Sequence, residues 1–428
     1  MSCVIGIDVG TSGVRTIVMN KRCEILSGGS ACLFADLGDD HRSPLLWWQG
    51  IEQALVKTLA QIPVEQLVAI CIDGTSGTVL PVDALGNCLA EPKMYNDAVE
   101  DGRILASIAS LMPSSSAAGG ATSGLAKALY FSALKPAHII HQADWIVGKF
   151  TNDYTHTDAN NALKSGYDPV TGCWPDWITE TGFNTQLFPV VSIPGTPLAT
   201  VSEKISRQFS ISDKVQIIAG TTDGCASFLA TGASDVGDAV TALGSTLTIK
   251  LLSDKPVFAP EYGVYSHRIG DKWLAGGASN SGGRALAQFF TTEALSSLSS
   301  VMDTSRPSGL DYYPLPAQGE RFPINDPQLQ PRTEPRPDDD ILFLQGLLEG
   351  ISAIELLGYQ RLMDNDAPQL RSICTVGGGS TNQSWTSIRQ RMMVNRFEEV
   401  VFRRADSEEA AAGTARLAVA GANEGKLW

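Results

Sequence analysis

Residues 4–20 of the chain, VIGIDVGTSGVRTIVMN, have the pattern of two short β-strands joined by a Gly-rich turn. Apolar or β-branched residues alternate with others before the turn and again after it, with the period of two of a strand. Gly10 and Gly13 are expected to supply the positive φ that a tight hairpin needs. Such a turn points backbone N–H groups into one concavity that can hold a phosphate. The stretch therefore predicts a phosphate-binding hairpin, with an ordinary hairpin as the alternative.

Side chains in and before this turn add to the prediction. Thr11 and Ser12 bring hydroxyl donors, and Asp8 ends the first strand, where a carboxylate can hold hydrated Mg²⁺. Residues 239–253, AVTALGSTLTIKLLS, repeat the pattern about halfway along the chain. One such hairpin opening each half suggests two related domains facing one nucleotide, which we place at residues 1–234 and 235–428.

Length, composition and charge narrow the class of protein. The 428 residues suffice for two or three domains, and 43% apolar with 18% charged residues is ordinary for a soluble globular enzyme. The net charge of −14 argues against a nucleic-acid or anionic-membrane partner, and the sequence has no Lys/Arg cluster of five or more. Backbone amides, hydroxyls and a metal ion would therefore have to hold an anionic nucleotide.

The cysteine pattern and the first residues of the sequence indicate where in the cell the protein is expected. None of the eight cysteines forms a C-x-x-C pair, so neither a zinc ribbon nor a thioredoxin-type site is expected. The sequence enters a predicted strand at once, without the pattern of a secretory signal peptide, and no run of 18 uninterrupted apolar residues occurs. We expect a cytoplasmic protein, or one of the plastid stroma if this is the mature form of a plant protein.

Strands that alternate with helices indicate an α/β fold of two mixed-sheet domains. Three apolar strands, predicted at 67–73, 215–219 and 371–376, each run into a polar Gly-rich turn, a common position for a binding loop. Further predictions are a third antiparallel strand at 23–34, mostly helical structure at 98–149, a helix at 284–302, a surface connection at 303–340, a strand at 399–403 and a helix at 407–422.

Asp223 is the acidic residue that this pattern singles out. It follows a buried strand and precedes an apolar helix, so it is either a helix N-cap or a catalytic carboxylate at the end of the strand. The turn Gly377-Gly378-Gly379 can let a flat ligand lie against the backbone, with Asn382 bonding a base or ribose. The alternative is a strand-to-helix connection with Asn382 near the cap. The sequence has no P-loop, G-x-G-x-x-G, G-x-S-x-G or H-E-x-x-H motif.

The order and spacing of four motifs resemble the FGGY family of carbohydrate kinases, within the actin–hexokinase–Hsp70 type of ATPase fold. The motifs are GIDVGTSGVRTIV at 6–18 (first phosphate motif), AGTTDGCASFLATG at 219–232 (catalytic segment), ALGSTLTI at 242–249 (second phosphate motif) and VGGGSTNQSWTSIRQ at 376–390 (adenosine motif). The resemblance covers nearly the whole chain. It implies two ribonuclease H-like domains with mixed sheets flanking an interdomain cleft.

The resemblance also implies an ATP-dependent kinase that phosphorylates the primary hydroxyl of a ketopentose. Asp223 would be the general base, and Asp8 would position Mg²⁺ through water. The implied phosphate-binding residues are Gly10, Thr11, Ser12, Gly244, Ser245 and Thr246, and the implied adenosine-binding residues are Gly377, Gly378, Gly379 and Asn382. The implied sugar-binding residues are Asp73, Ser76, Tyr95, Asp97 and Asp223.

Departures from the family pattern bear on the substrate. Tyr95 stands where the family usually has a sugar-side tryptophan, and the loop at 74–77 has neither the Arg-Glu pair of glycerol kinases nor the His-Gly of xylulose kinases. The chain is most similar to a short pentulose-kinase branch of plants and cyanobacteria, which implies D-ribulose as the substrate. D-Xylulose or glycerol phosphorylation, or a non-catalytic homologue that senses sugar or nucleotide, stay as alternatives. The partners expected are ATP and a small sugar, with the protein a monomer or homodimer.

Overall fold

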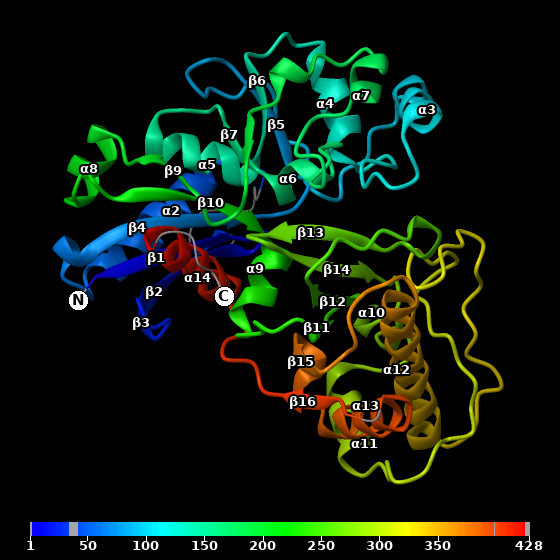
Figure 1. The fold of residues 1–428 in the computed structure, drawn as a ribbon. Coiled ribbons are helices and arrows are strands. Elements are labelled where there is room, and N and C mark those ends of the chain that lie inside the picture. The colour runs from blue at the N-terminus through cyan, green and yellow to red at the C-terminus, as the bar shows by residue number, and fades with distance from the viewer. Residues whose placement is uncertain (1, 34–41, 398, 424–428) are drawn as a thin grey trace. The chain divides into compact units, whose positions relative to one another are not determined.

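The computed structural model of the chain describes residues 2–33, 42–397 and 399–423 (Figure 1). The chain divides into two compact units. The first comprises Met1–Ala230, His267–Asp271 and Glu409–Trp428, and the second comprises Thr231–Ser266 and Lys272–Glu408. The boundary that we place at 234/235 lies near the first break between the units, whereas the C-terminal segment belongs with the first unit.

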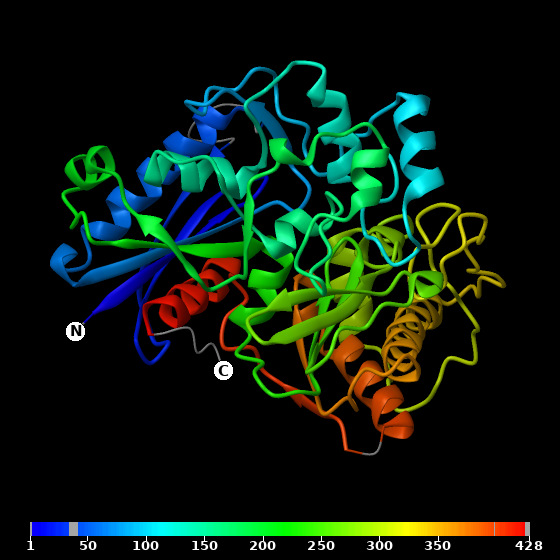
Figure 2. The same cartoon turned by 45° about the horizontal axis from the view of Figure 1, so that its top comes forward.

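Helix α14 (Ala410–Ala422) explains this grouping, because it packs against strands of the first sheet (Figure 2). Two glycines permit α14 to lie close to the strand at Cys3–Val9 and to the helix at Asp223–Ala230. A Cβ atom on Gly6 would lie 2.2 Å from the carbonyl oxygen of Ala411, and one on Gly413 would lie 1.8 Å from that of Ala226. The chain therefore returns to its first domain at the end.

The first unit is built on a six-stranded mixed sheet with the order β3-β2-β1-β4-β10-β9. The strands are β1 (Cys3–Val9), β2 (Gly13–Asn20), β3 (Ile25–Cys32), β4 (Leu67–Gly74), β9 (Pro197–Thr200) and β10 (Gln216–Thr222). Strands β1, β4 and β10 are parallel, so their carboxyl ends meet at one edge. The predicted antiparallel strand at 23–34 is confirmed as β3, although Phe34 lies outside the described residues.

Helices and two small sheets complete this unit. The helices are α2 (Pro44–Leu59), α3 (Gly102–Leu111), α4 (Gly124–Ser132), α5 (Gln142–Thr151), α6 (Ala159–Leu163), α7 (Asp176–Glu180), α8 (Glu203–Phe209), α9 (Asp223–Ala230) and the 3-10 turns η1 (Val64–Gln66) and η2 (Thr185–Leu187). The small sheets pair β5 (Val79–Val82) with β6 (His138–His141) and β7 (His156–Asp158) with β8 (Val190–Ser192). The mostly helical prediction for 98–149 missed β6, where the buried Ile139 and Ile140 pair with β5.

The second six-stranded mixed sheet has the order β13-β14-β12-β11-β15-β16, and all of its strands except part of β13 belong to the second unit. The strands are β11 (Asp238–Leu243), β12 (Leu247–Ser253), β13 (Tyr265–Ile269), β14 (Lys272–Ala278), β15 (Ser372–Val376) and β16 (Val401–Arg403). The helices are α10 (Gly283–Leu286), α11 (Thr292–Ser300), α12 (Asp340–Asp364), α13 (Gln383–Arg396) and the 3-10 turns η3 (Pro260–Tyr262) and η4 (Gly378–Thr381).

Two predictions for the second unit need correction. The helix predicted at 284–302 is divided into α10 and α11, because Thr291 caps a new helix by accepting a hydrogen bond from the backbone N–H of Ala294. The predicted surface connection at 303–340 has no helix or strand, but it buries Tyr312 and Phe322 in the core of the unit. Helix α12 is long and apolar enough to span a membrane by length and composition alone, yet 72% of its apolar window is buried, as in a core helix.

Candidate functional site

Three aspartates meet at the carboxyl edge of the first sheet. Asp8, near the end of β1, is the register partner of Asp73 on β4. Asp73 is also level with Thr221 on β10, and Asp223 is the first residue after that strand. Ligands of open α/β sheets bind beyond the carboxyl ends of the strands. The structure therefore assembles in one unit three carboxylates that the sequence analysis had assigned to metal, sugar and catalysis separately.

Burial sets the charge of this cluster. Asp73 is fully buried, and this burial, together with the charge of Asp8, raises the pKa of Asp73 well above its usual range. The hydroxyl of Thr414 on α14 donates a hydrogen bond to Asp73 Oδ2. Burial also raises the pKa of Asp8 and the charge of Asp223 adds to this shift, whereas Asp73 and the guanidinium of Arg15, 3.5 Å away, oppose it. Of the two carboxyl groups, Asp73 is therefore driven more strongly toward its neutral form.

The cluster fits the Mg²⁺ ion that the resemblance implies. Over residues 2–33, 42–397 and 399–423, no group of three or more His, Cys, Asp or Glu side chains forms a complete metal cage. Asp73 Oδ1, however, is buried without a hydrogen-bond partner beside the carboxylate of Asp8. Mg²⁺ prefers carboxylate oxygens and retains several waters. The donor set therefore suits an ion held through water, and this role of Asp8 stays a prediction.

We expect Asp73→Asn to raise thermal stability at pH 8 in metal-free buffer, with a gain that shrinks toward pH 5. The raised pKa means that the folded protein keeps a proton that the unfolded chain loses above about pH 4. The wild-type protein therefore loses stability as pH rises from there toward the folded pKa, and asparagine removes that loss. Melting temperature against pH measures it. Asp213→Asn, at an exposed position of the same unit, is the control, and a gain for Asp73→Asn that does not depend on pH would contradict the assignment.

Asp223 is positioned by the end of strand β10. It is the first residue of α9, half-buried, and its Oδ1 accepts a hydrogen bond of 2.7 Å from the N–H of Gly224. The pairing of β10 with β4 shifts register at Gly220, where a Cβ atom would lie 1.7 Å from the carbonyl oxygen of Ile72. Glycine is therefore required at this point, and regular pairing resumes at Thr221, two residues before α9 begins at Asp223.

Two asparagines that the sequence analysis missed hold the same strand end. The amide nitrogens of Asn160 and Asn161 donate to the hydroxyl and the backbone carbonyl of Thr221, at 2.9 and 3.3 Å. Asp158 orients Asn161 by accepting a hydrogen bond of 2.6 Å. No local pattern points to these contacts, because the residues lie about sixty positions from Thr221 in sequence.

The two predicted phosphate hairpins are both present. The N–H of Gly10 donates to the carbonyl of Gly13 at 3.0 Å, which leaves Thr11 and Ser12 at the tip of the first turn. The expectation of positive φ is wrong, since neither of these two described glycines has it. Gly13 is needed for a different reason: a Cβ atom there would lie 2.5 Å from the carbonyl oxygen of Ala31 on β3.

The second hairpin, within the second unit, has a turn that is one residue shorter, since Leu243 pairs with Leu247 whereas Val9 pairs with Val14. The N–H of Gly244 donates to the carbonyl of Thr246 at 3.3 Å, and Ser245 is exposed at the tip. A Cβ atom on Gly244 would meet only the Thr246 carbonyl, at 3.6 Å. Both hairpins thus have an exposed serine at the tip, Ser12 and Ser245, whose hydroxyl can donate to a phosphate, while phosphate contacts by these residues stay predictions.

The turn after β15 contains one open glycine between two packed ones. Gly377 has a φ of +87°, and a Cβ atom there would lie 2.9 Å from the carbonyl oxygen of Leu243. A Cβ atom on Gly379 would lie 2.7 Å from the Cβ atom of Leu243. A Cβ atom on Gly378 would meet nothing within 4 Å. The first and third glycines therefore serve packing, and the open side of Gly378 fits the predicted flat ligand.

Asn382 acts as a helix cap in this structure. Its Oδ1 accepts a hydrogen bond from the N–H of Trp385 at 3.0 Å, and its Nδ2 donates to Ser299 at 2.8 Å. The capping alternative considered from the sequence is thus confirmed, and a contact with base or ribose stays a prediction.

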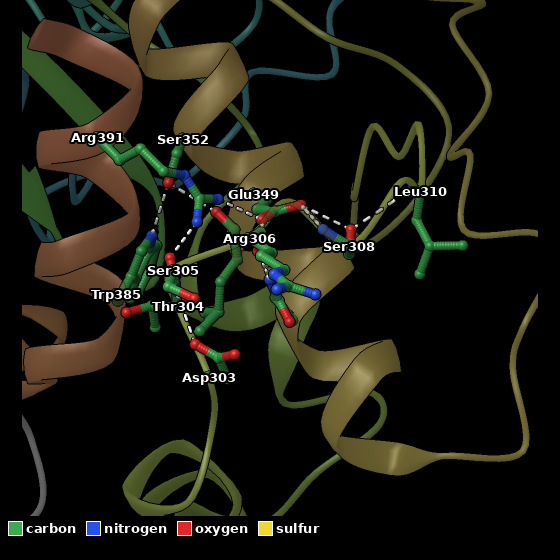
Figure 3. Close-up of polar contacts among 12 residues, drawn as sticks. Asp303, Thr304, Ser305, Arg306, Ser308, Leu310, Glu349, Ser352, Trp385 and Arg391 are labelled. Carbon is green, nitrogen blue, oxygen red and sulfur yellow. Dashed lines mark hydrogen bonds and ion pairs between the residues drawn. The ribbon is translucent and has the colours of Figure 1, made fainter. Parts of the chain in front are cut away.

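A polar network fixes α13 to α12 and to the segment that follows α11 (Figure 3). Arg391 on α13 pairs with Glu349 on α12 at 2.5 Å and donates to the carbonyl of Thr304. Glu349 also accepts hydrogen bonds from the N–H and hydroxyl of Ser308, at 2.9 and 2.6 Å. The helix that begins at the glycine turn is therefore held by contacts along its length.

The predicted sugar loop is rigidly held in the first unit. Thr75 is buried, and its N–H and hydroxyl both donate to Gln142 Oε1, at 2.9 and 2.8 Å. The hydroxyls of Thr75 and Thr78 lie 2.6 Å apart. Ser76, between them, stays half-buried. This arrangement fixes the backbone of the loop and leaves Ser76 as its accessible side chain.

The second predicted sugar segment is anchored by Arg42. The two carboxylate oxygens of Asp97 accept hydrogen bonds from Arg42 at 2.5 and 3.0 Å, and one also accepts from the N–H of Met94 at 2.7 Å. Partial burial raises the pKa of Asp97, but these donors outweigh it and lower the pKa. Tyr95 is 46% exposed. Asp97 thus has a structural role, and sugar contacts by Asp73, Ser76, Tyr95 and Asp97 stay predictions.

The comparisons with known proteins agree with this geometry. Residues 3–102 match the family model of the FGGY family of carbohydrate kinases, N-terminal domain. The chain is 21% identical to a xylulose kinase of Staphylococcus xylosus, over 98% of this chain and 91% of that protein. A crystal structure of a xyloylose kinase from Brucella ovis matches with a TM-score of 0.85 and 19% identity, over 99% of this chain and 91% of the other. Plasmodium falciparum glycerol kinase with ADP matches with a TM-score of 0.82 and 15% identity, over 98% and 89%.

The matches to solved structures show the fold of the protein. The two mixed-sheet units have the fold of the FGGY carbohydrate kinases, the actin-like ATPase fold. The segment that matches the family model, residues 3–102, contains the first predicted phosphate hairpin and the predicted sugar loop. The fold class that the sequence predicted is confirmed.

Proposed function

We propose that this protein is an ATP-dependent kinase of a small sugar that transfers the γ-phosphoryl group to a primary hydroxyl of a ketopentose. The observation that carries the proposal is the meeting of Asp8, Asp73 and the first residue of α9, Asp223, at one sheet edge beside a hydroxyl-bearing hairpin. Phosphoryl transfer needs positioned carboxylates and phosphate-binding amides, because the protein contributes mainly positioning and electrostatics. The family match over residues 3–102 supports it.

Each part of the first unit has a role in this proposal. Asp223 accepts the proton of the attacking hydroxyl, and the tip of the first hairpin binds phosphate oxygens. Asp8 would hold Mg²⁺ through water, and the bound ion would neutralise phosphate charge. Asp73, which accepts a hydrogen bond from Thr414 and is the register partner of Asp8, helps to keep Asp8 in place.

The second unit holds the nucleotide in this proposal. The exposed tip of the second hairpin, at Ser245, binds phosphate, and the open face of Gly378 takes the adenosine. Asn382 stabilises the turn by capping α13. Closure on both substrates would exclude water before transfer.

We propose D-ribulose as the preferred sugar, and D-xylulose as the second candidate. Ser76 is a small, neutral group in a loop with no charged side chain, which suits a chain longer than glycerol. The relatives named as xylulose kinases favour the second candidate. Both are ketopentoses, so the reaction class is the same for either.

The ranking of kcat/KM for D-ribulose, D-xylulose and glycerol tests the function. We expect D-ribulose first and glycerol last, because a site that bonds several hydroxyls loses about 1–3 kcal/mol for each polar group left unpaired. Ser76→Ala should raise the KM for sugar more than the KM for ATP. Glycerol in first place would reject the pentulose reading, and D-xylulose in first place would reject only the choice of isomer. Wild-type protein that turns over none of the three would favour a sensing homologue.

A further inference from the structure

A buried lysine that the site described so far does not use joins the two predicted sugar segments. Lys127 on α4 has no exposed surface. Its Nζ donates hydrogen bonds of 2.7 Å to the carbonyl of Gly77 and of 2.7 Å to the carbonyl of Met94. These carbonyls belong to the residues next to Ser76 and Tyr95. One side chain therefore connects the loop that follows β4 with the segment that follows β5.

Two further contacts lie in the same place. The N–H of Tyr95 donates to the hydroxyl of Thr78 at 3.1 Å, and that hydroxyl contacts Thr75. Because Lys127 is fully enclosed, it cannot touch a sugar, and its effect has to pass through the backbone that it holds. Burying the amine of Lys127 costs desolvation free energy, and an apolar side chain would fill the same space without that cost. The buried lysine therefore indicates a role for its two hydrogen bonds.

We propose that Lys127 is a positioning residue that fixes the distance between the Ser76 loop and the Tyr95 segment, and thereby sets affinity for the sugar and not for the nucleotide. The proposal rests on the function proposed above, because it gives these two segments the sugar. A small displacement of a positioned group costs as much as about 100-fold in rate, so a residue that holds two segments together has a large effect without touching the substrate.

The charge of Lys127 adds a dependence on pH. Burial, opposed by Asp97 and assisted by Lys164 and Lys93, lowers the pKa of Lys127 to about 7. Protonation therefore favours any opening that lets water reach Nζ. Below pH 7 the two segments should come apart more easily, and sugar should bind more weakly.

Lys127→Met removes both hydrogen bonds and keeps most of the side-chain volume. We expect the KM for D-ribulose or D-xylulose to rise about tenfold or more, with the KM for MgATP within about twofold. In the wild-type protein the KM for sugar should rise as pH falls from 8 to 6, and in Lys127→Met it should stay flat. A role in stability alone would not separate the two KM values or remove the pH dependence. Lys57→Met is the matched control, since Lys57 donates to the carbonyl of Ser30 at 2.8 Å on the exposed surface.

Hydrogen exchange of the ligand-free protein tests, without any sugar, whether Lys127 holds the Ser76 loop and the Tyr95 segment together. Exchange in peptides covering 74–79 and 94–98 should be faster in Lys127→Met than in wild type or Lys57→Met. Thr78→Val, which removes the contact to Tyr95, should act in the same direction and serves if Lys127→Met does not fold. Unchanged exchange, or an equal rise in both KM values, overturns the proposal. Wild-type protein that binds none of the sugars overturns the proposed function, and the exchange result then still decides whether Lys127 joins the two segments.

Discussion

Asp223→Ala should lower kcat for sugar phosphorylation by about 10²–10⁴-fold, the range typical for loss of a general base. The affinity for nucleotide should stay within a few-fold, because the proposal assigns nucleotide binding to other residues, at the two hairpin tips and at Gly378. The place of Asp223 after β10, next to the Asp8 and Asp73 carboxylates, is the reason for the expectation. Steady-state kinetics with the preferred sugar and titration with a nucleotide analogue measure the two quantities.

Two variants separate catalysis from helix capping. If Asp223 only caps α9, Asp223→Ala should behave like Asp101→Ala, which removes the N-cap of α3 and should cost about 0.5–2 kcal/mol of stability with no large loss of kcat. Asp223→Asn keeps a capping oxygen but cannot accept the proton as a carboxylate does. A kcat for Asp223→Asn close to that of wild type would remove Asp223 from the mechanism.

Local patterns predicted the strand ends and the residues at them. The alternation before the first turn placed Asp8 at the end of β1, and the apolar strands before the other polar turns placed Asp73 and Asp223 in the same way. Because neighbouring parallel strands end at the same edge of a sheet, local sequence patterns were enough to predict most residues of the candidate site. The prediction was wrong where a backbone position depends on an adjacent strand. At Gly13, glycine is required because a side chain would meet the backbone of β3, and not because of positive φ.

Contacts between distant parts of the chain could not be predicted in this way. Thr414 bonds Asp73 across 341 positions, and Lys127 bonds Gly77 across 50. Neither residue stands in a pattern that depends on its side chain, since α4 and α14 read as ordinary apolar helices. The partners of the functional residues are therefore a result of tertiary structure, and the composition of the helices does not reveal them.

Arg389→Met should lower the free energy of unfolding of the second unit by about 3–5 kcal/mol, because it leaves a buried carboxylate without its partner. Arg389 and Glu355 are both fully buried and form a two-point ion pair of 2.6 and 2.7 Å between α13 and α12. Arg389 also donates to Thr375 on β15 at 2.7 Å. The glycine turn lies between that strand and α13, so nucleotide affinity should fall together with stability.

Chemical denaturation, with hydrogen exchange in β15 as the local probe, measures this effect, and Arg336→Met is the matched control. Arg336 pairs with Asp340 at 2.8 Å on the surface, where such a pair contributes about 0–1 kcal/mol. The double variant Arg389→Met, Glu355→Met should recover much of the loss, because an apolar pair of similar volume leaves no charge buried. A loss for Arg389→Met no larger than that for Arg336→Met would show that the second unit does not depend on the pair. A double variant as unstable as the single one would instead assign the loss to packing around Arg389, and the position of the glycine turn would then be set by α13 as a whole.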